Sequence, residues 1–326
     1  MTQGFGDTPP HRMSRRQFMK WCASGLAFVS LQKNFWAQPA DAYGRADSAP
    51  ARPRKKIRGA YDLVVAKGND PYRQTVEAVA AMGGIGRFVA KNSVVVIKPN
   101  IGWDRTPEQA CNTNPQVVAA LIDICRQAGA KRVNIFDRTC NDSRRCYTNS
   151  GIERIAQKHG AQIFFPNDWN VLTARFPYES GMQGWPIYRE ALECDTFINV
   201  PVAKHHGLTK LTLSMKNLMG VCGGNRGMMH VDIGPKLVDL TDFIGPDLTV
   251  IDAYRVLVRH GPQGGSLEDV EEPKTIIVGT DPVLADSYAA QLFGSRPEEI
   301  PYLKASRERK FGSVDITAAA LHEITV

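Results

Sequence analysis

The chain has 326 residues, a formal net charge of +7, 43% hydrophobic residues and 22% charged residues. These values are ordinary for a globular protein, and they exclude an acidic disordered chain, a collagen-like chain and a multi-pass membrane protein. The length suits one large domain or two small ones, with a sizeable core in either case. The basic excess lies within the first 60 residues, and no base-stacking motif follows, so nucleic acid is not an expected partner.

The N-terminus carries two adjacent arginines ahead of a short apolar run. Arg15 and Arg16 stand in Ser-Arg-Arg-Gln-Phe-Met-Lys at 14–20, and residues 21–31 are mainly apolar. This pattern is typical of a twin-arginine export signal, and the run is too short to span a bilayer. We therefore expect a signal peptide at 1–42, the twin-arginine translocase as a partner, a periplasmic or otherwise exported protein, and no membrane span after cleavage. The alternative is a basic amphipathic start to a cytoplasmic protein.

Strands and helices alternate after a linker at 43–60, which is basic and rich in Pro and Ala. We expect strands at 61–66, 93–98, 132–136, 161–165, 196–200, 248–252 and 275–278. Helices are expected at 71–81, 115–128, 152–158, 208–219 and 281–293. This order predicts one α/β domain over 61–326, with a mostly parallel central sheet, flanking helices and a lobe inserted around 140–190. Ligands of such domains bind at the carboxyl ends of the strands.

Six cysteines follow the signal segment, and no two are spaced as Cys-x-x-Cys. An iron–sulfur cluster needs several thiolates at tight spacings, so the chain has no iron–sulfur motif. An even number of cysteines in an oxidising compartment is compatible with disulfides. Cys140 and Cys146 flank a polar loop and are the best candidates for a disulfide.

Polar segments follow several of the expected strands and begin the helices that come next. Lysine and asparagine side chains beside helix N-termini suit a carboxylate or a phosphate. We therefore expect a small anionic molecule as the ligand. The alternative is that each lysine is solvated and each asparagine is a turn or cap. The candidate ligand-binding residues are Lys98, Asn100, Asn114, Lys204, Asn217, Asp252 and Asp281.

Histidines form a second group of candidates. His205 and His206 are adjacent, so on a strand only one of them is expected to face the site. We expect His205, His206 and Lys216 to be the catalytic candidates, because histidine moves protons near neutral pH. A transition metal such as Zn, Ni or Fe is a second hypothesis, with His230, His260 and Cys222 as ligands. Their spacing does not select a metal, and purely structural histidines are the alternative.

Five ordered motifs resemble those of the family called domain of unknown function 362. They are Ile-Lys-Pro-Asn at 97–100, Asn-Pro at 114–115, Pro-Val-Ala-Lys at 201–204, Lys-Asn-Leu-Met-Gly at 216–220 and Gly-Thr-Asp-Pro at 279–282. The resemblance covers about 61–295. Members often carry ferredoxin-like cluster domains or twin-arginine signals. This chain has the signal and lacks the cluster cysteines, so the resemblance implies no iron–sulfur role here.

The segment order is also similar to the amino-terminal domain of lactate racemase-like proteins. That resemblance implies a nickel-bearing pyridinium cofactor tethered to lysine, with Lys216, Cys222 and His230 at comparable places. Together these patterns favour an exported enzyme, associated with a cofactor or metal, that acts on a small anionic substrate. Redox or proton transfer on a hydroxy or keto acid is the reaction we expect. The alternative is a non-catalytic periplasmic anion-binding protein or a maturation protein for a redox enzyme.

Overall fold

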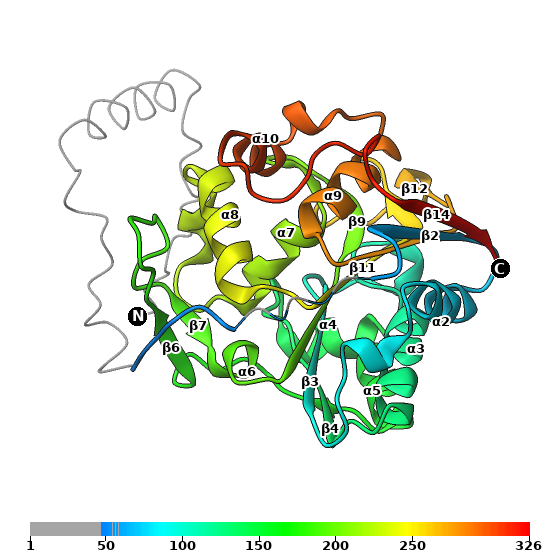
Figure 1. The fold of residues 1–326 in the computed structure, drawn as a ribbon, viewed down its shortest axis with the longest axis horizontal. Helices are drawn as coiled ribbons and strands as arrows, with labels where there is room; N and C mark the ends of the chain where they lie inside the picture. The colour runs from blue at the N-terminus through cyan, green and yellow to red at the C-terminus, as the bar shows by residue number, and fades with distance from the viewer. Residues whose placement is uncertain (1–46, 54, 56, 58) are drawn as a thin grey trace, which may run out of the picture. The chain divides into compact units, whose positions relative to one another are not determined.

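The computed structural model describes residues 47–53, 55, 57 and 59–326 (Figure 1). The expected signal peptide at 1–42 lies outside the described residues. An eleven-stranded sheet runs through the domain in the main order β14–β2–β13–β11–β8–β3–β4–β5. The bounds along this order are Leu321–Thr325, Leu63–Lys67, Thr275–Gly279, Leu248–Leu257, Thr196–Val200, Val94–Pro99, Arg132–Ile135 and Gln162–Ile163. Strands β9 (Val202–His206), β10 (Lys210–Thr212) and β12 (Val270–Glu271) join it off this path.

Strand directions agree with the expected fold class. Along the main order, neighbouring strands are parallel except that β13 is antiparallel to both β2 and β11. The prediction of an α/β domain with a mostly parallel sheet is therefore confirmed. Strand β3 is flanked by β8 and β4, and its β-branched run is buried on both faces, as parallel sheets require.

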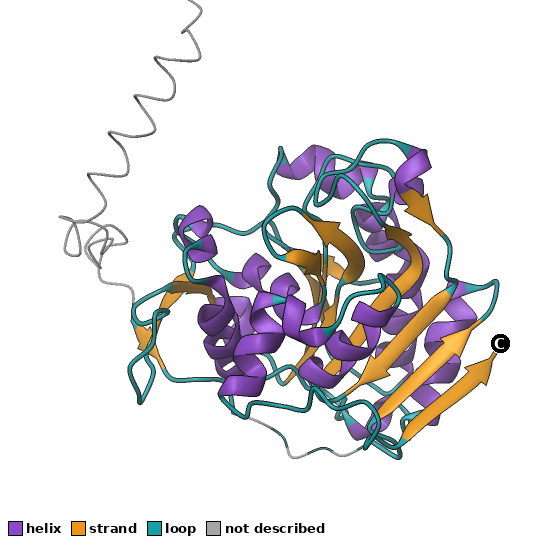
Figure 2. Cartoon of the chain, turned by 90° about the horizontal axis from the view of Figure 1, so that it is seen from above, coloured by secondary structure: helices purple, strands orange, loops and turns teal. Residues whose placement is uncertain are grey.

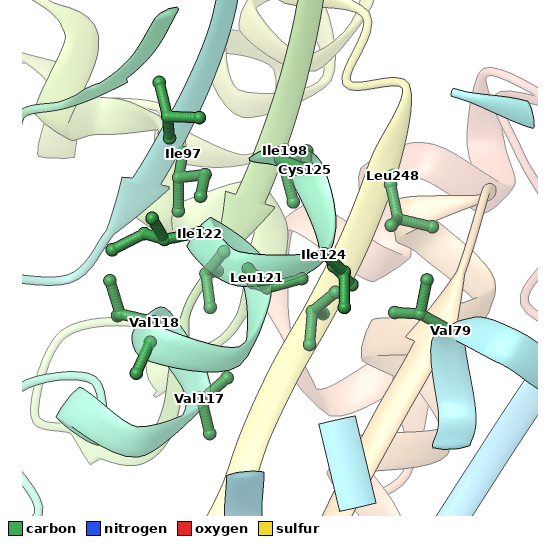
Figure 3. Close-up of a cluster of buried hydrophobic side chains, with 14 of the residues drawn as sticks. Val79, Ile97, Val117, Val118, Leu121, Ile122, Ile124, Cys125, Ile198 and Leu248 are labelled. Atoms are coloured by element: carbon green, nitrogen blue, oxygen red, sulfur yellow. The ribbon is translucent and has the colours of Figure 1, made fainter. Parts of the chain in front are cut away.

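Helices cover both faces of the sheet (Figure 1). Helices α2 (Pro71–Ala81), α3 (Pro115–Gln127) and α5 (Ile152–His159) pack on one face, and α4 (Ser143–Asn149) lies beside α5. On the other face are α7 (Ser214–Asn217) and α9 (Pro282–Gln291), with α8 (Ile233–Ile244) and α10 (Pro301–Glu308) packed beside them. Figure 3 shows the apolar stripe of α3 against sheet residues Ile97, Ile198 and Leu248.

A second, three-stranded sheet lies apart from the long strands (Figure 2). It consists of β1 (Ser48–Ala49), β6 (Val171–Ala174) and β7 (Pro186–Tyr188), and β7 leads directly into α6 (Arg189–Leu192). Two of its strands fall within 140–190, the segment where we expected an inserted lobe. No helix in the described part of the chain is long and apolar enough to cross a membrane.

One residue of the expected linker, Arg52, is anchored in the domain. Arg52 is buried, ion-paired with the buried carboxylate of Asp247, and donates to the carbonyl of Gly245. A buried ion pair of this kind holds both chain segments in place, because separating the partners leaves an uncompensated charge. The linker expected over 43–60 is therefore anchored to the domain at Arg52.

The prediction of a single helix at 208–219 is wrong. The segment instead contains β10, the short helix α7 and a 3-10 turn at Leu218–Val221. Lys210 has a φ of 61°, which is outside the helical region. Helix α7 begins where the buried carboxylate of Asp286 accepts hydrogen bonds from the backbone amides of Ser214 (2.7 Å) and Met215 (3.0 Å). Burial raises the pKa of Asp286 to about 7.

Candidate functional site

A cavity of about 420 Å³ lies at the carboxyl ends of β3 and β4 and beside β9 and α7. This is the edge at which ligands of doubly wound α/β sheets bind, and the volume is suitable for a small organic molecule. Apolar side chains form part of the cavity wall, among them Trp103, Leu208, Met219 and Pro262. The charged and hydrogen-bonding side chains that line it include Asn100, Asp137, Arg138, Lys204, His206, Lys216, Asn217, Arg226 and His230.

A chain of hydrogen bonds joins two buried lysines beneath this cavity. The Lys98 ammonium donates to Asn217 Oδ1 (3.1 Å), which also accepts from the Asn100 amide (3.0 Å). Asn100 Oδ1 in turn accepts from the Lys204 ammonium (3.0 Å). Lys98 is fully buried and ion-paired with Asp137 at 2.7 Å. Lys98 is therefore part of the support of the site, and Asn100, Lys204 and Asn217 line the cavity itself.

Gly220 permits this arrangement because a side chain would have no room there. A Cβ atom at this position would lie 1.7 Å from Asp137 Oδ1 and 2.7 Å from Lys98 Nζ. The last residue of the motif at 216–220 thus allows the α7 segment to approach the Lys98–Asp137 ion pair closely.

Lys204 and Lys216 both face the cavity, and burial lowers the pKa of each. The pKa of Lys204 is lowered to about 8 and that of Lys216 to about 7. Lys204 still donates to Asn100 and to the Cys111 carbonyl. Lys216 Nζ instead lies 3.0 Å from Met219 Sδ and 3.4 Å from His230 Nε2. A lysine in such surroundings exchanges a proton readily near neutral pH.

Two histidines, His206 and His230, also line the cavity, and their stacked rings have centroids 5.7 Å apart. Nδ1 of His206 accepts from the backbone amide of Leu208 (3.1 Å), so its proton is on Nε2. Nδ1 of His230 lies 3.2 Å from the Gly227 carbonyl, and a donating Nδ1–H there leaves Nε2 as a free base beside Lys216. Burial lowers the pKa of both rings, that of His206 to about 3, so both are neutral near pH 7.

His205 does not face this cavity. As expected for adjacent residues on a strand, it points away from His206, and its Nδ1 accepts from the backbone amide of Gly261 (3.1 Å). The catalytic role expected for His205 in this cavity therefore has no geometric basis, whereas His206 and Lys216 remain candidates.

The three expected metal ligands do not come together. His230 lines the cavity, His260 is exposed and bound to Asp269, and Cys222 is fully buried outside the cavity lining. Over 47–53, 55, 57 and 59–326, no group of three or more His, Cys, Asp or Glu side chains is arranged to hold a metal ion. The predicted ligand set is therefore wrong for the described residues.

Three expected ligand-binding residues instead stabilise backbone turns and helix starts. Asn114 caps α3, and its own amide donates to the buried carboxylate of Asp252 at 2.7 Å. Burial raises the pKa of Asp252 to about 6. Asp281 caps α9 by accepting from the amides of Val283 and Leu284. The ligand site therefore contains fewer residues than we expected, and these three residues stabilise the backbone around it.

The expected disulfide is not formed. Cys140 and Cys146 are both free thiols, as are the other four cysteines in the described residues. Cys146 is buried on α4, where its thiol faces the carbonyl of Gly102, whereas Cys140 is exposed at the cavity and lies 3.8 Å from an Arg226 guanidinium nitrogen. One thiol is thus exposed and the other buried.

Sequence reasoning missed four charged or reactive residues of the cavity. Asp137, Arg138 and Cys140 follow β4, and the rule that ligands bind at strand ends would have found them. Arg226 lies in the glycine-rich loop after α7, and its guanidinium donates to the carbonyls of Arg138 and Thr139. No local signal in the sequence marks Arg226 as a cavity residue.

The fold and cavity define an α/β protein with a cationic ligand site at the carboxyl edge of a mostly parallel sheet. The family model described as "Domain of unknown function (DUF362)" matches residues 95–291, which is more than half of the chain. The chain therefore belongs to this family, as its ordered motifs predicted.

The proteins similar to the chain include one curated protein and two solved structures. The "Thylakoid-associated protein sll1697" of Synechocystis sp. is 27% identical over 237 residues, covering 70% of this chain and 71% of that protein. The lactate racemase apoprotein of Thermoanaerobacterium thermosaccharolyticum has a TM-score of 0.44 at 12% identity, covering 76% of this chain and 59% of the other. A Thermotoga maritima protein has a TM-score of 0.36 at 12% identity, covering 70% and 60%. The chain thus spans about three fifths of the length of each solved structure.

The donor groups fit the expected lysine-tethered nickel cofactor only in part. Lys216 and His230 lie together at the cavity, so a point of attachment and an imidazole are in place. Cys222 is outside the cavity lining, and burial raises the pKa of its thiol to about 12, which keeps it protonated. The set as a whole does not fit this cofactor.

Proposed function

We propose that this protein is an exported enzyme that binds a small anionic molecule in the cavity and moves a proton on it. The single observation that carries the proposal is the charge of the cavity lining. Arg138, Lys204, Lys216 and Arg226 line it, and Asp137, the one carboxylate among its described lining residues, is already paired with Lys98. A bound carboxylate or phosphate offsets the repulsion among these cations.

Three side chains at the cavity, His206, His230 and Lys216, can act as bases in the proton transfer, because each is neutral or easily loses its proton near pH 7. His206, His230 and Lys216 line one cavity, and the pKa of Lys216, about 7, matches the pH at which a general base is most effective. Lys204, with a pKa of about 8, is mostly protonated at neutral pH and binds the anion. A keto acid provides both the anionic group and an acidic carbon–hydrogen bond next to its ketone, and a 2-hydroxy acid provides the anionic group and a carbon–hydrogen bond next to its carboxylate.

Replacing Lys204 with Met tests anion binding. The change keeps most of the side-chain volume and removes one charge-assisted contact, so the affinity for oxalate is expected to fall about 10- to 100-fold by calorimetry. Lys158→Met, an exposed change on α5, is the matched control and is expected to bind like the parent protein. Equal affinity of the Lys204 variant and the parent would place the anion elsewhere.

Exchange of substrate hydrogen with solvent deuterium distinguishes an enzyme from the alternative, a non-catalytic anion-binding or maturation protein. An enzyme that moves a proton is expected to incorporate solvent deuterium at the hydroxyl-bearing carbon of a 2-hydroxy acid or at the carbon next to the ketone of a keto acid. Binding without such incorporation across a panel of these acids favours the binding protein.

We also propose export by the twin-arginine translocase, which the paired arginines at 15 and 16 support. The name of the similar Synechocystis protein associates that protein with thylakoids, which is compatible with a protein that leaves the cytoplasm. Changing Arg15 and Arg16 together to Lys is expected to leave folded precursor in the cytoplasm. Cell fractionation measures this, and unchanged recovery outside the cytoplasm contradicts the proposal.

A further inference from the structure

Lys216 differs from the other two buried lysines in the partners of its amine. Lys98 is paired with a carboxylate, and Lys204 donates to two oxygen atoms. The Lys216 amine has a thioether and an imidazole as its nearest partners, and no carboxylate in the described part of the chain lies within ion-pair distance of it. It nevertheless faces an open cavity large enough for a ligand. Neither partner carries a negative charge that would stabilise the ammonium form of Lys216. This position therefore favours the neutral amine.

We infer that Lys216 is a nucleophile that forms an imine with the carbonyl group of a small anionic ligand, an inference that rests on the proposed function. A buried lysine among other cations, without a carboxylate partner, is the form in which lysine attacks carbonyl compounds. The pKa of Lys216 is lowered to about 7, mainly by burial and in smaller part by the nearby cations Lys204 and Arg226, against the opposing effect of Cys140. A large share of the amine is therefore neutral near pH 7.

The reaction balances with the groups present. The Nζ lone pair forms a bond to the carbonyl carbon, and the carbonyl electron pair moves to oxygen. The two amine protons then leave with that oxygen as water, and the carbon–nitrogen double bond remains. His230 Nε2, 3.4 Å from Nζ, is placed to take a proton from nitrogen and return it to the departing oxygen. No oxidant or reductant is needed.

The cavity also defines the ligand class, a carbonyl compound that carries a carboxylate. Lys204 and Arg226 supply positive charge at the cavity lining, and Trp103 and Met219 add apolar surface to it. The carboxylate would be held by the cations while the carbonyl meets Lys216. A 2-oxo acid has both groups on adjacent carbons, which is suitable for a cavity of about 420 Å³.

Reductive trapping tests the inference on the mature full-length chain. Incubation with pyruvate and sodium cyanoborohydride is expected to add the mass of pyruvate less one oxygen atom, and peptide mapping is expected to place it on Lys216. Lys216→Met is expected to lose the label, and Lys158→Met is expected to keep it. Acetone, which has a carbonyl and no charge, is expected to label far more weakly than pyruvate.

Three results would overturn the inference. The first is labelling at other lysines only, with thermal unfolding showing that the Lys216 variant is folded. The second is a purified chain whose Lys216 already carries a permanent group, because the amine would then be an attachment point. The third is oxalate binding at this cavity without any trapping by pyruvate, which rejects the imine and leaves the proposed anion site intact. Absence of both oxalate binding and trapping rejects the proposed function as well.

Discussion

Replacement of Lys98 with Met is expected to lower the free energy of unfolding by about 3–5 kcal/mol. The Asp137 carboxylate, 2.7 Å from the Lys98 ammonium, is only 2% exposed, so the variant would leave a buried charge without its counterion. Asp137 would retain the Ile101 amide at 2.6 Å, which is too little to offset the desolvation of a full charge. Urea unfolding followed by circular dichroism measures the loss.

A double replacement distinguishes the ion pair from packing. If the cost arises from the unpaired carboxylate, Lys98→Met with Asp137→Asn is expected to recover part of the stability that Lys98→Met alone loses. The exposed pair of Lys67 and Glu323, at 3.5 Å, gives the control, and Lys67→Met is expected to cost about 1 kcal/mol or less. A similar cost for Lys98→Met and Lys67→Met would contradict the role given to the buried pair.

Local patterns in the sequence were enough to predict most of the frame of this site. The β-branched run of β3 and the Asn-Pro start of α3 each carry their signal within a few neighbouring residues, and both elements form where they were expected. The rule that ligands bind at strand ends then placed Lys204, Lys216 and Asn217 at one cavity.

Long-range contacts decided the parts that the sequence did not predict. Lys98 looked like a ligand-binding cation because its partner, Asp137, follows a different strand and has no local link to it. The helix expected at 208–219 failed because Asp286, 72 residues further along the chain, fixes where α7 begins. Arg226 reaches the cavity through carbonyls of the β4 loop, 87 and 88 residues away. Such pairings depend on topology, which composition and periodicity do not encode.

The affinity of the cavity for an anion is expected to fall steeply as the pH rises from 6 to 9. A lysine beside a bound anion has a higher pKa in the complex than in the free protein. Binding is therefore at full strength when the pH is below the pKa that the lysine has in the free protein, and it weakens as the pH rises through that value. With free pKa values of about 7 for Lys216 and about 8 for Lys204, the loss for oxalate reaches about a thousandfold at pH 9.

The two lysines leave separate marks on this profile, so each can be assigned by its own variant. Lys216→Met is expected to remove the part of the decline that begins near pH 7, and Lys204→Met the part that begins near pH 8. The two cavity histidines do not mimic this pattern. Burial lowers the pKa of His206 to about 3, so it stays neutral over this range, and the pKa of His230 is lowered as well. Calorimetric titration with oxalate at several pH values measures the profile, and Lys158→Met should reproduce that of the parent protein. An affinity that does not change between pH 6 and 9 would mean that neither lysine meets the anion, because a contact with either one must be lost with its proton.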